Sequence, residues 1–172
     1  MNSSIKSLIF DLDGTLIDSV PAIGQSLNEV LVKEGLQALS IEQVREYVGF
    51  GAKWMIKEAL ELRKVVDIEE RLDEFMEQYF INYLRVSDKY TVVYDGVFDV
   101  LEELKDREIK MAICTNKPGP TTLVVLENLG LKKYFDAVLT EDDVSNRKPD
   151  PRHVFETLRA IRASIDTTVF IG

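Results

Sequence analysis

Two aspartates lie two positions apart in the stretch Leu-Ile-Phe-Asp-Leu-Asp-Gly-Thr-Leu, residues 8–16. The apolar residues before them are typical of a buried strand, and Gly14 with Thr15 indicates a turn directly after it. Along an extended chain Asp11 and Asp13 point the same way, so they repel each other unless a cation or a proton lies between them. Metal-assisted phosphoryl transfer needs such a pair, as nucleophile, proton shuttle and anchor for Mg²⁺. An ordinary Asp-Gly turn is the alternative, but Asp-x-Asp-Gly-Thr arises by chance in only about one chain of this length in several hundred.

Two further groups of polar residues come later in the chain. Thr115 and Asn116 follow an apolar run and precede Lys117-Pro118, whose proline suits the start of a helix. A hydroxyl and free backbone amides at a helix N-terminus form a cradle for phosphate, although an ordinary helix cap uses the same residue types. Lys148 lies in Arg-Lys-Pro-Asp-Pro, residues 147–151. Alone it would be a solvated lysine, but opposite two aspartates it is a candidate cation for phosphoryl oxygens.

The periodicity of the chain predicts the elements that carry these residues. From residue 90 onward, apolar strands alternate with amphipathic helices: helix 97–104, strand 109–114, helix 123–129, strand 135–139, helix 151–161 and strand 167–171. This alternation predicts a parallel sheet covered by helices on both faces. The segment 16–89 has helical periodicity only. We therefore expect an α/β core from residues 1–15 and 90–172 with an all-helical insert, and candidate residues at the carboxyl ends of the strands.

Composition narrows the class of protein. With 172 residues and 45% hydrophobic residues, the chain suits one compact domain or a core with a small insert. A formal charge of −9 argues against nucleic acid and anionic membranes as partners. The stretch before Leu8 does not resemble a secretory signal. Cys114 is the only cysteine, which excludes an intrachain disulfide and favours a reducing, cytoplasmic setting.

Together the motifs resemble the haloacid dehalogenase-like superfamily, and within it the phosphoglycolate phosphatase-like branch with a helical cap. The resemblance runs through Asp-Leu-Asp-Gly-Thr-Leu (11–16), Val-Gly-Phe-Gly-Ala (48–52), Asp-Gly-Val (95–97), Cys-Thr-Asn-Lys-Pro (114–118), Arg-Lys-Pro-Asp-Pro (147–151) and Val-Phe-Ile-Gly (169–172). It implies a Rossmann-like parallel sheet with the insert 16–89 as cap. It also implies a phosphatase that acts on a small phosphorylated metabolite, either phosphoglycolate-like or a sugar phosphate.

The resemblance also implies roles for single residues. Asp11 attacks phosphorus and becomes an aspartyl phosphate, while Asp13 protonates the leaving alkoxide and then activates water. Mg²⁺ binds the Asp11 carboxylate and the Asp13 main-chain carbonyl. Thr115, Asn116 and Lys148 hold the phosphate oxygens, and Lys148 thereby takes part in catalysis.

The chain departs from the family pattern after the strand 169–172. The family continues with an aspartate and a further acid that complete the Mg²⁺ shell, and then with another strand and helix. We therefore expect a shortened form of a longer enzyme with strongly reduced activity, as a monomer or as a homodimer associated through the exposed last strand. The acids 141–143 are expected to form a solvated turn, and Asp166 lies at the wrong end of its strand.

Within the insert, Gly49-Phe50-Gly51 is the predicted substrate-facing loop, and Lys53 is a candidate contact to a substrate carboxylate. The alternative is a plain helix–helix turn with a surface lysine. The size of Phe50 argues against phosphoglycolate itself, because by the resemblance a smaller polar residue is usual there. His153 is expected to be exposed, and Cys114 is expected to be a small buried strand residue.

Other functions stay open at this point. A sugar-phosphate mutase of the same superfamily would retain both aspartates but return the phosphoryl group to substrate. A dehalogenase is disfavoured because Asp13 has no role in it, and a phosphonatase would need a Schiff-base lysine, for which Lys53 or Lys57 are the candidates. A non-catalytic remnant that binds phosphate or a partner would use the last strand as its interface.

Overall fold

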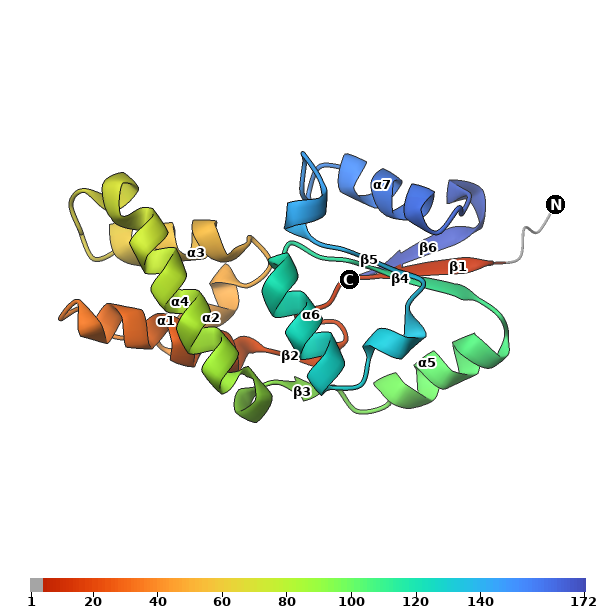
Figure 1. Ribbon diagram of the computed structural model, residues 1–172, viewed down its shortest axis with the longest axis horizontal. Coiled ribbons are helices and arrows are strands. Elements are labelled where there is room, and N and C mark those ends of the chain that lie inside the picture. The colour runs from red at the N-terminus through yellow and green to blue at the C-terminus, as the bar shows by residue number, and fades with distance from the viewer. Residues whose placement is uncertain (1–4) are drawn as a thin grey trace. The chain divides into compact units, whose positions relative to one another are not determined.

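The computed structural model describes residues 5–172, which form two compact units (Figure 1). The α/β unit contains the chain up to Asp18 and Val92–Gly172, and the helical unit contains Ser19–Thr91. A two-stranded antiparallel ribbon of β2 (Ile17–Asp18) and β3 (Val92–Val93) joins the points where the chain leaves and re-enters the α/β unit. The helical unit is therefore an insertion whose two ends are tied together.

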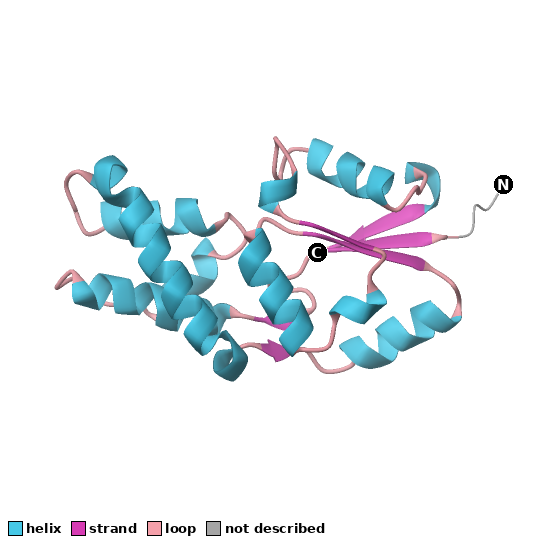
Figure 2. Cartoon of the chain, in the orientation of Figure 1, coloured by secondary structure: helices cyan, strands magenta, loops and turns pink. Residues whose placement is uncertain are grey.

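A four-stranded parallel sheet forms the centre of the α/β unit, in the order β5-β4-β1-β6 (Figure 2). The strands are β1 (Ser7–Phe10), β4 (Lys110–Cys114), β5 (Ala137–Leu139) and β6 (Thr168–Ile171). Phe10 pairs with Ile113 on one side and with Ile171 on the other, so three strands end at the same edge. The prediction of an α/β fold with a parallel sheet is confirmed.

Helices cover both faces of this sheet, with α7 (Arg152–Ala160) on one face and α5 (Val97–Asp106) and α6 (Gly119–Asn128) on the other (Figure 1). On the α7 face, Ile9, Ala112 and Cys114 pack with apolar residues of the helix. Cys114 is fully buried, as predicted. The intervening strand residues are buried too, because a sheet covered on both faces has apolar side chains in both directions. Short 3-10 helices complete the unit: η1 (Lys132–Tyr134), η2 (Glu141–Asp143) and η3 (Ile165–Thr167).

Strand β6 lies at the edge of the sheet and keeps much of its apolar surface exposed. Val169, Phe170 and Ile171 are 39%, 40% and 38% exposed. Among the described strands, β6 pairs with β1 alone. The expectation of an exposed apolar last strand is therefore confirmed.

The helical unit consists of four helices around its own core. They are α1 (Val20–Lys33), α2 (Ile41–Tyr47), α3 (Ala52–Glu61) and α4 (Ile68–Tyr90). The long helix α4 packs along α1 and against α3, with Phe75 and Tyr83 fully buried. Ser40 and Gln43 form a reciprocal capping box at the start of α2. No helix within residues 5–172 is long and apolar enough to cross a membrane.

His153 differs from expectation, because its side chain is fully buried in the first turn of α7 rather than exposed. The position lies on the inner face of the helix, together with the buried Thr157 one turn later. Burial lowers the pKa of the imidazole, and the charge of Lys148 acts in the same direction. The backbone of Leu139 and the negative charges of Asp11 and Asp143 act in the opposite direction on this pKa. The folded chain therefore holds His153 in its neutral form to a lower pH than an exposed histidine.

Acidification from pH 7.5 to 5.5 is expected to destabilise the chain by up to about 1.4 kcal/mol through His153. In the unfolded chain the imidazole titrates near its ordinary pKa of about 6.5. Below that pH the unfolded state binds more protons than the folded state, so stability falls as the pH falls. Urea unfolding at both pH values measures the effect, and His153→Gln must lose less stability on acidification than the wild type. Equal losses in the two proteins would contradict this account.

Candidate active site

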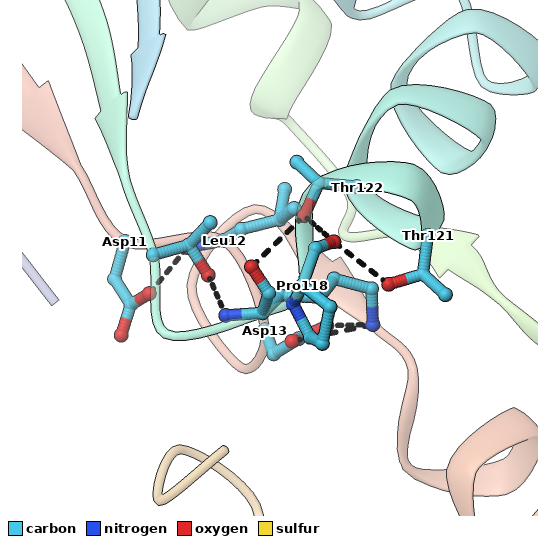
Figure 3. A network of polar contacts seen from close by, with 8 residues as sticks. Asp11, Leu12, Asp13, Pro118, Thr121 and Thr122 are labelled. Atoms are coloured by element: carbon cyan, nitrogen blue, oxygen red, sulfur yellow. Dashed lines mark hydrogen bonds and ion pairs between the residues drawn. The ribbon is translucent and has the colours of Figure 1, made fainter. Parts of the chain in front are cut away.

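Asp11 is the first residue beyond β1, and its neighbours hold both its backbone and its carboxylate. Its backbone N–H donates to the carbonyl of Ile171 in β6 at 2.8 Å. The Asp11 carboxylate accepts the N–H of Leu12 through Oδ1 at 2.7 Å (Figure 3). The chain then turns at Gly14, whose φ of +84° lies in the left-handed region that favours glycine. The apolar strand and the Asp-Gly turn read from the sequence thus present Asp11 at the carboxyl edge of the sheet.

Lys148 pairs with Asp11. Its Nζ lies 2.8 Å from Asp11 Oδ1, and the two side chains are 17% and 25% exposed. The ammonium also lies 5.4 Å from the centre of the Phe170 ring, which comes from β6. A cation held this close to a carboxylate offsets its charge when an anionic substrate approaches. The structure therefore brings together Asp11 and the lysine singled out from the sequence.

Asp13 pairs with a different lysine. Lys117 Nζ lies 3.2 Å from Asp13 Oδ1 and 3.4 Å from Oδ2. The two side chains are only 4% and 11% exposed. Sequence reasoning gave Lys117 no chemical role, although its place directly after Thr-Asn, at the end of a buried strand, was the available signal. Each aspartate of the pair therefore faces its own lysine.

Thr115 and Asn116 lie at the end of β4 and tie this end to the neighbouring loops. Thr115 donates its backbone N–H to the carbonyl of Leu139 at 3.0 Å and is 1% exposed. Asn116 donates through Nδ2 to the carbonyl of Lys148 at 3.0 Å, so one side chain connects the β4 turn to the loop that carries the lysine. These two residues thus belong to the same edge of the sheet as Asp11.

The first turn of α6 follows directly after these residues and is held by local side-chain contacts. The hydroxyls of Thr121 and Thr122 both donate to the carbonyl of Pro118 at 2.9 Å (Figure 3). Figure 3 shows this turn together with Asp11 and Asp13. The helix therefore begins in a defined position beside the paired aspartates.

The three acids of η2, residues 141–143, form contacts that hold neighbouring parts of the chain in place. Asp142 accepts the backbone N–H of Gly119 at the start of α6 at 2.7 Å, and Asp143 accepts hydrogen bonds within its own turn. Glu141 pairs with Arg147 at 2.8 Å, and its side chain is only 15% exposed. Burial raises the pKa of Glu141, while the bond to Arg147 lowers it. The expectation of a solvated acidic turn is therefore wrong for Glu141.

Within the described part of the chain, no group of three or more His, Cys, Asp or Glu side chains is arranged to hold a metal ion. The acids of the turn after β1 remain as candidate oxygen donors for a cation. The carboxylate of Asp11 and the neighbouring Asp13 form this donor set. It suits a hard cation that retains water and substrate oxygens among its ligands.

The remaining candidates lie in the loop between α2 and α3 and in the first turn of α3, within the helical unit. Gly49 and Gly51, with φ of +99° and +88°, form the connection between α2 and α3. Phe50 is 53% exposed, and its ring centre lies 4.4 Å from that of Trp54. Lys53 lies in the first turn of α3 and is exposed. The loop therefore presents an aromatic pair and a cation, whereas the residues around Asp11 all belong to the α/β unit.

Gly172→Ala is expected to lower kcat roughly ten- to a hundredfold, with little change in the melting temperature. An added Cβ at this position would lie 3.0 Å from Asp11 Cβ and 3.0 Å from the ring of Phe170. The methyl group must therefore displace the candidate nucleophile by a few tenths of an ångström. Gly24→Ala is the matched control, because its Cβ would meet Val44 in the helical unit at 3.3 Å. Similar kcat values for Gly172→Ala and Gly24→Ala would contradict the predicted displacement of Asp11.

Comparison with known proteins identifies a family and several relatives that this chain resembles. The haloacid dehalogenase-like hydrolase family matches residues 8–172. Phosphoglycolate phosphatase from Agrobacterium fabrum is 34% identical over 164 residues, covering 95% of this chain and 70% of that protein. Phosphoglycolate phosphatase from Pseudomonas fluorescens Pf0-1 is 35% identical over 173 residues, covering 97% and 62%. This chain thus spans between three-fifths and three-quarters of the length of these relatives.

A solved structure agrees with the sequence comparison. The crystal structure of a predicted phosphoglycolate phosphatase from Haemophilus somnus matches with a TM-score of 0.93 at 25% identity, covering 100% of this chain and 78% of that one. The agreement therefore includes the sheet and the helical insertion. The family match spans nearly all of the described residues, so the chain belongs to the haloacid dehalogenase-like hydrolases.

Proposed function

We propose that this chain is a phosphatase that hydrolyses a small phosphomonoester through an aspartyl-phosphate intermediate. The observation that carries the proposal is Asp11, held at the carboxyl edge of the sheet with Lys148 at 2.8 Å and followed by a second acid in the same turn. The phosphoglycolate phosphatases among the relatives support a substrate of similar size. The acids and the lysine support the reaction class, and the relatives support the substrate class.

In the first half-reaction Asp11 attacks the phosphorus in line with the ester bond. Its Oδ1 is engaged by Leu12 N–H and Lys148, so we assign the attack to Oδ2. The Oδ2–P bond forms as the ester P–O bond breaks, and Asp13 gives a proton to the leaving alkoxide. Lys148 offsets the charge on the phosphoryl oxygens.

In the second half-reaction water replaces Asp11 on phosphorus. Asp13, now a carboxylate, takes the proton of the attacking water, the P–O bond to water forms and the bond to Asp11 breaks. Inorganic phosphate leaves, and both aspartates return to their starting states. The hydroxyl of Thr115 and the amide of Asn116, at the neighbouring strand end, orient the phosphate oxygens during both steps.

Mg²⁺ fits the donor set at this turn. The Asp11 carboxylate and the Asp13 main-chain carbonyl would hold it, and both are the oxygen ligands that this ion prefers. When bound, it supplies positive charge that screens the nucleophile from the phosphate. Two protein donors form a small set, so we propose that Mg²⁺ binds weakly and that turnover needs it at high concentration.

We also assign substrate selection to the helical unit. Its loop offers the exposed Phe50, stacked beside Trp54, and the cation Lys53. An aromatic surface favours an organic group with apolar character, and a lysine favours a substrate carboxylate or a second phosphate. Phe50→Ala is therefore expected to change the order of preference among substrates while leaving the residues around Asp11 intact.

The test is phosphate release from a panel of phosphomonoesters, with phosphoglycolate and sugar phosphates included, over a series of Mg²⁺ concentrations. We expect release that depends on Mg²⁺. Mass spectrometry of acid-quenched enzyme is expected to find a phosphoryl group on the peptide that contains Asp11. Turnover without a phosphoryl group on this peptide would exclude the covalent route, and a folded chain with no turnover would exclude the proposed function.

A further inference from the structure

Lys117 places a buried positive charge against Asp13. The lysine side chain is 4% exposed, and its Nζ contacts both carboxylate oxygens of Asp13, at 3.2 and 3.4 Å. A buried ammonium is costly unless an opposite charge is close, so each side chain restricts where the other lies. Contact with both oxygens also sets the plane of the carboxylate. The pair is therefore a geometric constraint on Asp13.

The backbone of Lys117 is itself anchored on both sides. Its N–H donates to the hydroxyl of Thr115 at 3.1 Å, and its carbonyl accepts the hydroxyl of Thr122 at 3.4 Å. The first contact comes from the end of β4 and the second from α6. The lysine is thus attached to the turn that carries the proposed phosphate-binding residues and reaches across to the turn that follows β1. It connects these two loops through Asp13.

The two lysines of the site have separate partners. Lys148 contacts Asp11, which we propose as nucleophile, and Lys117 contacts Asp13, which we propose as acid and base. Proton transfer requires the same carboxyl group to face first the leaving oxygen and then the attacking water, within hydrogen-bond reach of each. An Asp13 carboxylate that rotated freely would lose that direction.

We propose that Lys117 is a positioning residue that acts through Asp13: it holds this carboxyl group in the direction needed for both proton transfers. The inference rests on the proposed function, because it takes the proton-transfer role of Asp13 from it. Lys117 itself forms no bond and transfers no proton in either step, and it acts only through its contact with the Asp13 carboxylate. Its loss should therefore affect the steps that need a proton and spare the attack by Asp11.

Lys117→Met tests this through the leaving group. Release of p-nitrophenolate from p-nitrophenyl phosphate needs no proton, whereas release of an alkoxide does. In the first turnover, the variant should release nitrophenolate at close to the wild-type rate. With the best alkyl phosphate of the panel, the first turnover should slow by roughly a hundredfold. Steady-state turnover of both substrates should fall similarly, because hydrolysis of the aspartyl phosphate needs Asp13 as base.

Three further variants make the result specific. Lys117→Arg retains the charge and should recover part of the lost rate. Lys133→Met removes a lysine whose side chain is 63% exposed and should match the wild type. In a background of Asp13→Asn, the change Lys117→Met should have little further effect, since residues that act as a unit are not additive. Thermal unfolding of each variant checks that the fold is retained.

Two results would overturn the inference while leaving the proposed function in place. One is a first turnover of nitrophenyl phosphate that Lys117→Met slows as strongly as that of the alkyl phosphate, which would place Lys117 on the attack step. The other is a full additional loss in the Asp13→Asn background. A wild-type chain that releases no phosphate from any substrate would instead remove the proposed function, and this inference with it.

Discussion

Asp11→Asn is expected to reduce phosphate release by about 10⁴-fold or more, because the amide that replaces the carboxylate cannot form the covalent intermediate. The replacement is nearly isosteric and can still accept the N–H of Leu12, so the turn should keep its shape. The measurement is Mg²⁺-dependent phosphate release under saturating substrate. Acid-quenched samples should at the same time lose the phosphoryl group on the Asp11 peptide.

Asp166→Asn is the matched control for this variant. Asp166 is exposed in η3, at the amino end of β6, and therefore lies at the opposite end of this strand from the candidate site. The Asp166→Asn variant should therefore turn over substrate at the wild-type rate. Residual activity of Asp11→Asn within about tenfold of the wild type would show that another group attacks phosphorus, since loss of a nucleophile costs far more.

Phe75→Ala is expected to destabilise the helical unit by about 3–5 kcal/mol. Phe75 is fully buried in α4, and the guanidinium of Arg71 lies 4.5 Å above its ring. Truncation to alanine would remove that contact and leave a cavity between the helices. Urea unfolding followed by the fluorescence of Trp54 measures the effect, because this single tryptophan lies in α3 of the same unit.

Ile81→Ala is the control on the same helix. Ile81 is 60% exposed, so its truncation should change the free energy of unfolding by less than about 0.5 kcal/mol. A loss for Phe75→Ala no larger than that of Ile81→Ala would mean that the core of the helical unit repacks around the missing ring. The difference between the two losses in unfolding free energy therefore tests whether Phe75 holds this core together.

Much of the α/β unit was predictable because its signals are local. Apolar runs such as 109–114 are long enough to identify strands, and their alternation with helices implies a parallel sheet. The topology then places strand ends at one edge, which is why Asp11 and Asn116 were expected near each other. The strands and their common edge needed periodicity and topology only. Lys148 was expected there because a lysine opposite two aspartates is a candidate cation for phosphoryl oxygens, and the family resemblance implies the same role.

The sequence was less informative where a single side chain had to be oriented. His153 is predicted to be exposed, but the inward face of α7 includes both His153 and Thr157, one turn apart. Which face of a helix packs against the sheet decides the burial of such a residue, and the residue type alone does not show it. Lys117 was missed because its direction depends on the turn after β4, and no periodic pattern describes a turn. Glu141 was misjudged for a related reason, since its burial depends on a partner six residues away, Arg147.

The short ribbon of β2 and β3 has a consequence for how such chains diversify. Ile17 lies opposite Val93, so the two ends of the α/β chain are joined here by β2 and β3 whatever segment lies between them. The entropy of closing an inserted segment grows only slowly with the length of that segment. Helical insertions of very different size can therefore be exchanged between the same two strands at nearly equal thermodynamic cost. An exchange of the helical unit would therefore change the loop that we propose to select the substrate, while Asp11 and Lys148 stay in the α/β unit.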